Sequence, residues 1–260
     1  MIGISKWIKD KNLFEIDGHI HLFNKDKVSK TIESAPLSVG FIDIEPKFIE
    51  SYQSTMSYYD NYISNHYDES KTILLASSTN ADEMIEMHKK WPNIIKGFGE
   101  IKCYAEWKGK ELNLDKLSKY WPVFKYASEN DLPIYIHFSL YDINRVKRLT
   151  SLLKRYPKVK VVLCHCGMDE FTEDKEFAFY SVLNLMDRFS NLYTDISYTA
   201  LDYFSTCPMK LLKFKSDRIL TGTDLNQISE DKKEENVSKI NKVLPYFDNT
   251  FNIKKLFNLL

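Results

Sequence analysis

Short apolar runs alternate with amphipathic stretches along most of the chain. Runs of about four to eight β-branched or apolar residues, bounded by polar or turn residues, are typical of β-strands. Seven strands are predicted in this way, at residues 13–23, 72–76, 94–101, 134–137, 159–163, 192–196 and 219–220. Residues 37–44 can supply an eighth strand.

The stretches between these runs carry apolar residues at helical spacing. Between residues 45 and 63 apolar side chains recur every three or four positions, and Pro46 suits a first helical turn. Further helices are predicted at residues 81–90, 115–129 (with Pro122 as a kink or restart), 144–155, 177–189, 232–243 and 253–260. Alternating strands and helices predict an α/β fold with a parallel sheet, and we expect one domain over residues 1–260.

Two histidines on the first predicted strand are the most informative chemical feature. Strand side chains alternate, so His19 and His21 are expected on the same side. Two neutral imidazoles on one face form half of a divalent-metal site. The alternative is a pair of histidines that only make hydrogen bonds at a strand end.

Four more residues of metal-binding type follow later predicted strands. Glu100, His137, His165 and Asp224 each stand where an apolar run gives way to a loop. An open sheet would leave Asp224 far from His19, whereas a closed barrel brings the first and last strands together. The pattern therefore predicts a (β/α)8 TIM barrel, in which some distortion is allowed, with a metal site at one end.

Composition narrows the function classes. The chain has 36 Lys plus Arg and 36 Asp plus Glu, and this balance does not favour binding to nucleic acid or to an anionic membrane. No run approaches the roughly 20 apolar residues that span a bilayer, and residues 1–11 lack the apolar core of a signal peptide. Four scattered cysteines do not suggest a disulfide framework, so a cytoplasmic location is the default expectation.

The sequence Cys164-His165-Cys166 resembles a small metal-binding motif. Strand alternation nevertheless predicts that both cysteines face away from the side of His165. We therefore expect them to pack as small hydrophobic residues under a helix, and we do not count them as ligands.

Other polar residues are weaker candidates. Lys102 and Arg145 are predicted to bind an anionic group of a substrate. Asp17 and Asp195 lie on predicted strands, where each carboxylate either orients a histidine or has a structural or surface role.

Several motifs together resemble the amidohydrolase superfamily, most closely its amidohydrolase-2 and TatD-like branches. The resemblance begins near residue 13 and runs to the C-terminus. It rests on segments 17–21 (DGHIH), 99–101 (GEI), 132–137 (LPIYIH), 165–167 (HCG), 191–197 (NLYTDIS), 221–224 (TGTD) and 252–260. Each motif is weak alone, but their common order is specific.

The resemblance implies a role for each candidate ligand. His19, His21 and Asp224 match metal ligands of the superfamily, and His137 and His165 match residues that bind the same or a second metal. Glu100 matches the residue that bridges two metals in TatD-like members, whereas other branches use a carboxylated lysine, for which Lys102 is suitably placed. Many amidohydrolase-2 members hold one metal, and there the residue matching His165 contacts water or substrate.

The implied cofactor is a divalent metal, one or two ions, with Zn²⁺ favoured and Mn²⁺ or Fe²⁺ allowed. A cation of this kind lowers the pKa of its water to about 7. Asp224 is expected to take the proton of that water and pass it to the leaving group, with His165 as a second catalytic residue. Residues 224–226 (DLN) lack the proline that the family often has two residues after the aspartate, so the substrate is not carried over.

The leading hypothesis is a metal-dependent hydrolase that attacks a C–N, C–O or P–O bond of a small substrate. The alternatives are a decarboxylase of the amidohydrolase-2 type, a TatD-like deoxyribonuclease or phosphodiesterase, and a barrel that binds without turnover. Histidinol-phosphatase-like phosphoesterases also begin with His-x-His, but their second Asp-x-His is missing after Asp224. A small-molecule partner is expected, nucleic acid only in the TatD-like case, and homo-oligomerisation is left open.

Overall fold

A parallel eight-stranded sheet forms the centre of the protein. The computed structural model describes residues 16–21, 37–41, 55–103, 106–107, 110–111, 116–169, 172–222, 224 and 233–259. The strands are β1 (Ile16–His21), β2 (Leu37–Phe41), β3 (Thr72–Ala76), β4 (Ile95–Lys102), β7 (Ile134–His137), β8 (Val161–Leu163), β9 (Leu192–Ile196) and β10 (Ile219–Thr221). They follow one another in the sheet in chain order, and every neighbouring pair is parallel.

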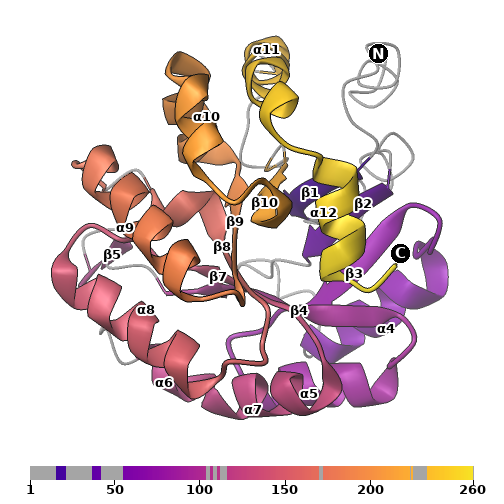
Figure 1. Ribbon diagram of the computed structural model, residues 1–260. Coiled ribbons are helices and arrows are strands. Elements are labelled where there is room, and N and C mark those ends of the chain that lie inside the picture. The colour runs from indigo at the N-terminus through magenta and orange to yellow at the C-terminus, as the bar shows by residue number, and fades with distance from the viewer. Residues whose placement is uncertain are drawn as a thin grey trace.

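Helices surround this sheet (Figure 1). They are α4 (Thr55–Asn65), α5 (Ala81–Lys90), α6 (Lys116–Lys119), α7 (Trp121–Asn130), α8 (Ile143–Arg155), α9 (Lys175–Arg188), α10 (Tyr198–Thr206), α11 (Lys233–Val243) and α12 (Asn249–Leu256). Pro122 lies in the first turn of α7, so it starts a new helix, as one of the two sequence interpretations expected. The helix start predicted at residues 45–46 lies outside the described residues.

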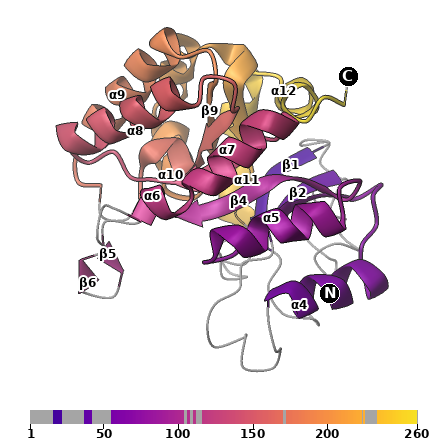
Figure 2. The same ribbon diagram turned by 90° about the horizontal axis from the view of Figure 1, so that it is seen from below.

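Helix α10 and the strands β5 (Glu106–Trp107) and β6 (Lys110–Glu111) were not predicted. Helix α10 follows β9 directly, and its apolar residues are mixed with Thr and Ser, which weakens the helical signal. Strands β5 and β6 form a small antiparallel hairpin apart from the main sheet (Figure 2).

Strand alternation divides the buried apolar residues into two layers. The inner layer fills the curled sheet with side chains such as Tyr135, Val162, Tyr193 and Leu220. The outer layer lies between the strands and the surrounding helices, and it contains the intervening strand residues such as Ile136. This division is the arrangement of a TIM barrel, in which the interior is a packed core.

Helix α12 covers one end of this interior. Its residues Ile253 and Leu256 and the following Phe257 belong to the inner layer, and the Phe257 ring stacks on Tyr135 at 6.5 Å between centroids. Lys160, which immediately precedes β8, donates through Nζ to the carbonyl oxygen of Leu256 at 3.3 Å. The contact with a residue before β8 places α12 at the N-terminal ends of the strands.

The first and last strands meet, which completes the predicted barrel in a distorted form. The backbone N–H of Asp224, just beyond β10, donates to the carbonyl oxygen of His19 at 2.9 Å. Gly18 allows this approach, because a Cβ atom there would lie 2.7 Å from the carbonyl oxygen of Thr221. The prediction of a (β/α)8 barrel with some distortion is therefore confirmed. None of the helices among the described residues is long and apolar enough to cross a membrane.

The seam between β1 and β10 yields a test of the fold. Replacing Gly18 with alanine puts a methyl group against the Thr221 carbonyl, and we expect overpacking to lower the free energy of unfolding by about 1–3 kcal/mol. Urea unfolding measures the change. Ser151→Ala, on the exposed face of α8, is the control and should change it by less than about 0.5 kcal/mol. Equal midpoints for Gly18→Ala and the wild type would show that the seam is not this tight.

Candidate metal centre

Polar side chains gather where the barrel strands end. His19 lies on β1, Glu100 on β4, His137 at the end of β7 and Asp195 on β9, while His165 and Asp224 come two and three residues after the ends of β8 and β10. All six side chains are buried, none more than 6% exposed. They lie at the end of the barrel opposite α12, which is the end where barrels of this kind carry their active sites.

A β-bulge turns Glu100 inward. Phe98 pairs with Ile134 and Ile101 with Ile136, so Gly99 and Glu100 together face the single residue Tyr135. Phe98 and Ile101 both pack in the outer layer, which leaves Glu100 directed to the interior. Gly99 has φ 131°, and a Cβ atom there would lie 2.7 Å from the carbonyl oxygen of Tyr135, so glycine is required.

A left-handed turn after β8 brings His165 inward beside its neighbour. Val162 and then Cys164 belong to the inner layer, so strand alternation continues to Cys164. His165 and Cys166 then have φ values of 54° and 55°, and this turn directs the His165 ring to the same side.

The prediction for Cys164 was therefore wrong, because it assumed that His165 was still part of a regular strand. Cys164 is 1% exposed and belongs to the inner layer, next to the ring of polar side chains. The prediction for Cys166 is confirmed, since that residue packs in the outer layer between strands and helices. Burial, together with the nearby carboxylates of Glu100 and Asp195, raises the pKa of the Cys164 thiol well above its ordinary value.

Asp195 connects His19 with His165. Its Oδ2 lies 3.1 Å from Nδ1 of His19, and its Oδ1 accepts the backbone N–H of His165 at 3.1 Å. Ser197 donates its hydroxyl to the same carboxylate and lies 2.8 Å from Nδ1 of His165. Of the two sequence interpretations of Asp195, the structure supports the one in which it orients a histidine.

Glu100 connects the other pair of imidazoles. Its Oε1 lies 2.9 Å from Nδ1 of His137 and 3.5 Å from Nε2 of His165. The His165 ring lies 4.6 Å from that of His137 and 5.0 Å from that of His19, measured between centroids. Asp224 completes the cluster, with Oδ1 3.6 Å from Nε2 of His19.

The three carboxylates determine the protonation of the histidines. Burial acts to lower the pKa of His19, but Asp195, Asp224 and Glu100 raise it from 6.5 to about 10. Burial is also opposed at His165, where the hydrogen bond to Glu100 and the charge of Asp195 give a raised pKa. At His137 burial outweighs Glu100, and the pKa is lowered. The cluster is thus an electronegative site that holds a proton on His19 in the absence of another cation.

The donor atoms suit a divalent metal ion. One ligand atom each from His19, Glu100 and His165 lie within 4.8 Å of one another, and the same holds for His19, Cys164 and Asp195. Imidazole nitrogen, carboxylate oxygen and sulfur are the donors that zinc uses in proteins. The cluster therefore fits the cofactor that the sequence implied.

Several predicted site residues have a different status. The side chain of His21 and that of Asp17 lie outside the described part of the chain, so their roles stay predictions. Lys102 is half-buried at the end of β4, opposite His137 in the sheet register, and its role as a substrate or bridging residue also stays a prediction.

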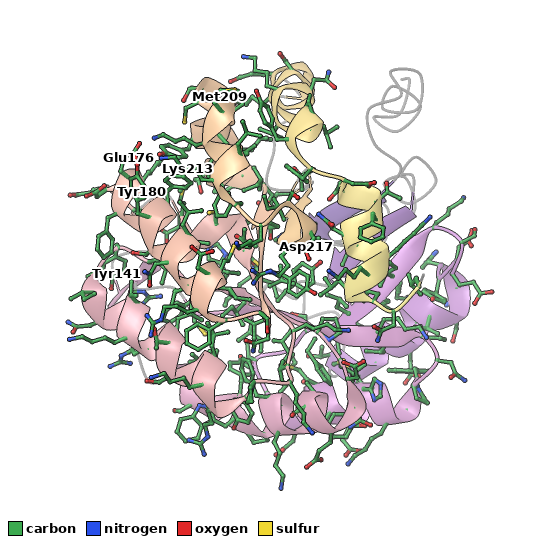
Figure 3. All side chains as sticks on the ribbon, in the orientation of Figure 1. Tyr141, Glu176, Tyr180, Met209, Lys213 and Asp217 are labelled. Atoms are coloured by element: carbon green, nitrogen blue, oxygen red, sulfur yellow. The ribbon has the colours of Figure 1, made fainter. Side chains whose placement is uncertain are left out.

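Arg145 has a structural environment in this fold. Its guanidinium is 1% exposed, donates to the carbonyl oxygens of Ser139 and Cys103 (2.8 Å for Cys103), and lies 4.0 Å over the Phe138 ring and 5.0 Å from that of Tyr141. Tyr141, labelled at the left edge of Figure 3, lies in the loop between β7 and α8. These contacts do not support the prediction that Arg145 binds an anionic substrate group.

Sequence reasoning missed Ser197 and Tyr198. Ser197 follows Asp195 at a spacing of two, which is the signal that would have placed both on the inner side of β9. Tyr198, at the start of α10, has its ring 5.8 Å from that of His165 in an edge-on arrangement. It has φ 46°, a backbone conformation that local sequence does not reveal.

Comparisons with solved structures agree with the barrel fold. Among solved structures, dihydroorotase from Campylobacter jejuni is similar with a TM-score of 0.56 and 12% identity, over 95% of this chain and 84% of the other. The 2,6-dihydroxybenzoate decarboxylase from Rhizobium is similar with a TM-score of 0.59 and 12% identity, over 95% of this chain and 99% of the other. An amidohydrolase from Burkholderia multivorans with bound Zn has a TM-score of 0.61 and 11% identity, over 94% of this chain and 99% of the other. At such identities these likenesses show a common fold, and comparison with curated proteins gives no match.

The family comparison goes further than the fold. A model of the amidohydrolase family matches residues 95–225, half of the chain, and this segment runs from the start of β4 to just beyond Asp224. It includes Glu100, His137, His165 and Asp224. The chain therefore belongs to the amidohydrolase family of enzymes.

Proposed function

We propose that this enzyme is a metal-dependent hydrolase that cleaves a C–N, C–O or P–O bond of a small substrate. The observation that carries the proposal is the convergence of His19, Glu100 and His165 at one end of the barrel, with donor atoms within 4.8 Å of one another. Proteins of the amidohydrolase family bind divalent metals, and a structure of the same fold holds Zn. We propose Zn²⁺ as the metal, one or two ions.

The residues of the cluster divide into those that hold the metal and those that move a proton. His19, Glu100, His137, His165 and, as an expectation from the sequence, His21 would hold the cation, with Asp195 fixing the orientation of His19 through Nδ1. When bound, a divalent cation polarises the bond to be cleaved and makes a water molecule a stronger acid.

Asp224 is suited to proton transfer. Its carboxylate is 2% exposed and lies 3.6 Å from Nε2 of His19, and its backbone N–H is bonded to the His19 carbonyl. A carboxylate in this position accepts the proton of the attacking water and returns it to the leaving group. His165 has its Nδ1 next to Ser197, so its Nε2 faces the site, where it contacts either the metal or the substrate.

A decarboxylase is the second candidate. Its specific support is the Tyr198 ring beside His165, which offers an aromatic wall to an aromatic acid, together with the fold shared with 2,6-dihydroxybenzoate decarboxylase. The hydrolase is preferred because a metal and an acid–base carboxylate suffice for it, whereas a ring-binding pocket is an additional requirement.

Metal content and activity test the proposal directly. Protein purified without chelator should contain about one or about two equivalents of metal by elemental mass spectrometry, and His19→Gln should lose most of it because a ligand is removed. His88→Gln is the matched control, since His88 is buried in the outer layer with its Nδ1 3.0 Å from the hydroxyl of Tyr126.

Activity is then measured on esters, lactones, amides, phosphodiesters and hydroxybenzoates. Turnover of one of the first four classes, lost in His19→Gln and in Asp224→Asn, supports the hydrolase. Release of CO₂ from the hydroxybenzoates would support the decarboxylase instead. Metal-free protein, even after incubation with Zn²⁺ or Mn²⁺, would contradict both.

Proton competition at His19 predicts a pH dependence of metal binding. A histidine ligand must be neutral, and His19 keeps its proton up to about pH 10 in the metal-free protein. The apparent affinity for Zn²⁺ should therefore rise by about tenfold per pH unit for each proton displaced, between about pH 6 and about pH 9. Competition with a chromophoric chelator measures this slope, and an affinity that does not change with pH would rule out His19 as a ligand.

Removing the charge of Asp195 separates its two effects on His19, which are the orientation of the ring and the raised pKa. Asp195→Asn should weaken Zn²⁺ binding by about 10–100-fold at high pH, because the His19 ring is no longer held at Nδ1 by a carboxylate. The loss should be smaller at low pH, since the pKa of His19 falls with the charge and the proton competes less. Asp187→Asn, at an exposed carboxylate paired with Lys215 at 3.4 Å, should leave the affinity unchanged. Equal affinities at every pH for Asp195→Asn and wild type would contradict the role of Asp195.

A further inference from the structure

Cys164 occupies the inner side of the barrel, next to the candidate metal centre. The thiol is 1% exposed, and the inner-layer residues around it are the apolar side chains below the site. Above it lie the carboxylates of Glu100 and Asp195, and the Cys164 thiol shares a hydrogen bond with Glu100. Cys164 thus stands at the boundary between the apolar interior and the polar cluster.

The thiol is close enough to other donors to share a cation with them. Ligand atoms of His19, Cys164 and Asp195 all lie within 4.8 Å of one another. His19 also belongs to the group formed with Glu100 and His165. His19 is therefore common to a group that contains the sulfur of Cys164 and to a group that contains the carboxylate of Glu100.

We propose that Cys164 is a sulfur ligand of the same metal ion that His19 binds. The inference rests on the proposed function, because it assigns one more ligand to the same metal. Binding releases the thiol proton to solvent, and the resulting thiolate forms the bond to the metal. Thiolate is a soft donor, so the centre is built for Zn²⁺ in preference to Mn²⁺ or Mg²⁺, which favour oxygen.

The chain contains its own comparison residue. Cys166 is two positions away and fully buried, but it packs in the outer layer and faces the helices. If sulfur at this turn only fills space, Cys164 and Cys166 should respond alike to substitution. If Cys164 binds metal, only its replacement should change the spectrum of the bound ion.

Cobalt substitution provides the test. Metal-free protein is loaded with Co²⁺, which shows visible bands in any protein site and an additional near-ultraviolet charge-transfer band when a thiolate is bound. Wild type and Cys166→Ser should both show the charge-transfer band, and Cys164→Ser should lose it while retaining the visible bands. Cys164→Ser should also lower the preference for Zn²⁺ over Mn²⁺ by about ten- to a hundredfold.

The outcomes separate this inference from the proposed function. Stoichiometric Co²⁺ without the charge-transfer band in wild type would overturn the sulfur ligand and leave the metal-dependent enzyme intact. Failure of the wild type to bind Co²⁺ or Zn²⁺ would overturn both. If Cys164→Ser does not fold, X-ray absorption of the zinc-loaded wild type decides: a sulfur neighbour at about 2.3 Å supports the proposal, and nitrogen and oxygen neighbours alone, at about 2.0–2.2 Å, contradict it.

Discussion

The close approach of the first and last strands is the constraint on which the site depends. His19 and Asp224 lie near opposite ends of the sequence, and they meet only because the sheet curls until β1 reaches β10. Gly18 makes the approach sterically allowed, and the backbone hydrogen bond from Asp224 fixes its register. An open sheet built from the same strands would contain every candidate ligand, but it would not bring them together in one metal centre. The barrel is therefore part of the chemistry as well as the support for it.

Much of the fold follows from hydrophobic pattern alone. Parallel strands that are buried on both faces are short apolar runs, and the eight barrel strands lie where such runs were found. The candidate ligands were also recognisable, two by their spacing on the first strand and the others, Glu100, His137, His165 and Asp224, by their place at the end of a run. What pattern could not supply is the local geometry at Glu100 and His165, where a bulge and a left-handed turn interrupt the alternation. If strand alternation is assumed to continue past these points, side chains are assigned to the wrong face of the sheet, and this is why the prediction for Cys164 was wrong.

Electrostatics explains why these particular side chains tolerate burial together. Three carboxylates and three imidazoles share a space from which water is largely excluded, and each carboxylate has a nitrogen partner within 3.6 Å. Without a metal, protons neutralise the cluster, most firmly at His19. A divalent cation held by the same side chains would replace those protons, because metal binding and protonation compete for the same donor atoms. A sulfur ligand from Cys164 would change which cation is preferred, but protons and metal would still compete for the same groups.

Helix α12 lies near the end of the sequence, so the order of synthesis limits when the barrel can be completed. During synthesis the chain emerges from its first residues onward, at roughly 5–20 residues per second, and β1 has no partner for its seam until β10 has emerged. The barrel interior stays open at the other end until Phe257 can stack on Tyr135 and Lys160 can bond to the end of α12. The ligands of β1 and β4 are therefore made long before they can act together. The cluster can therefore assemble only after the chain has been made as far as Asp224, whose backbone bonds to His19.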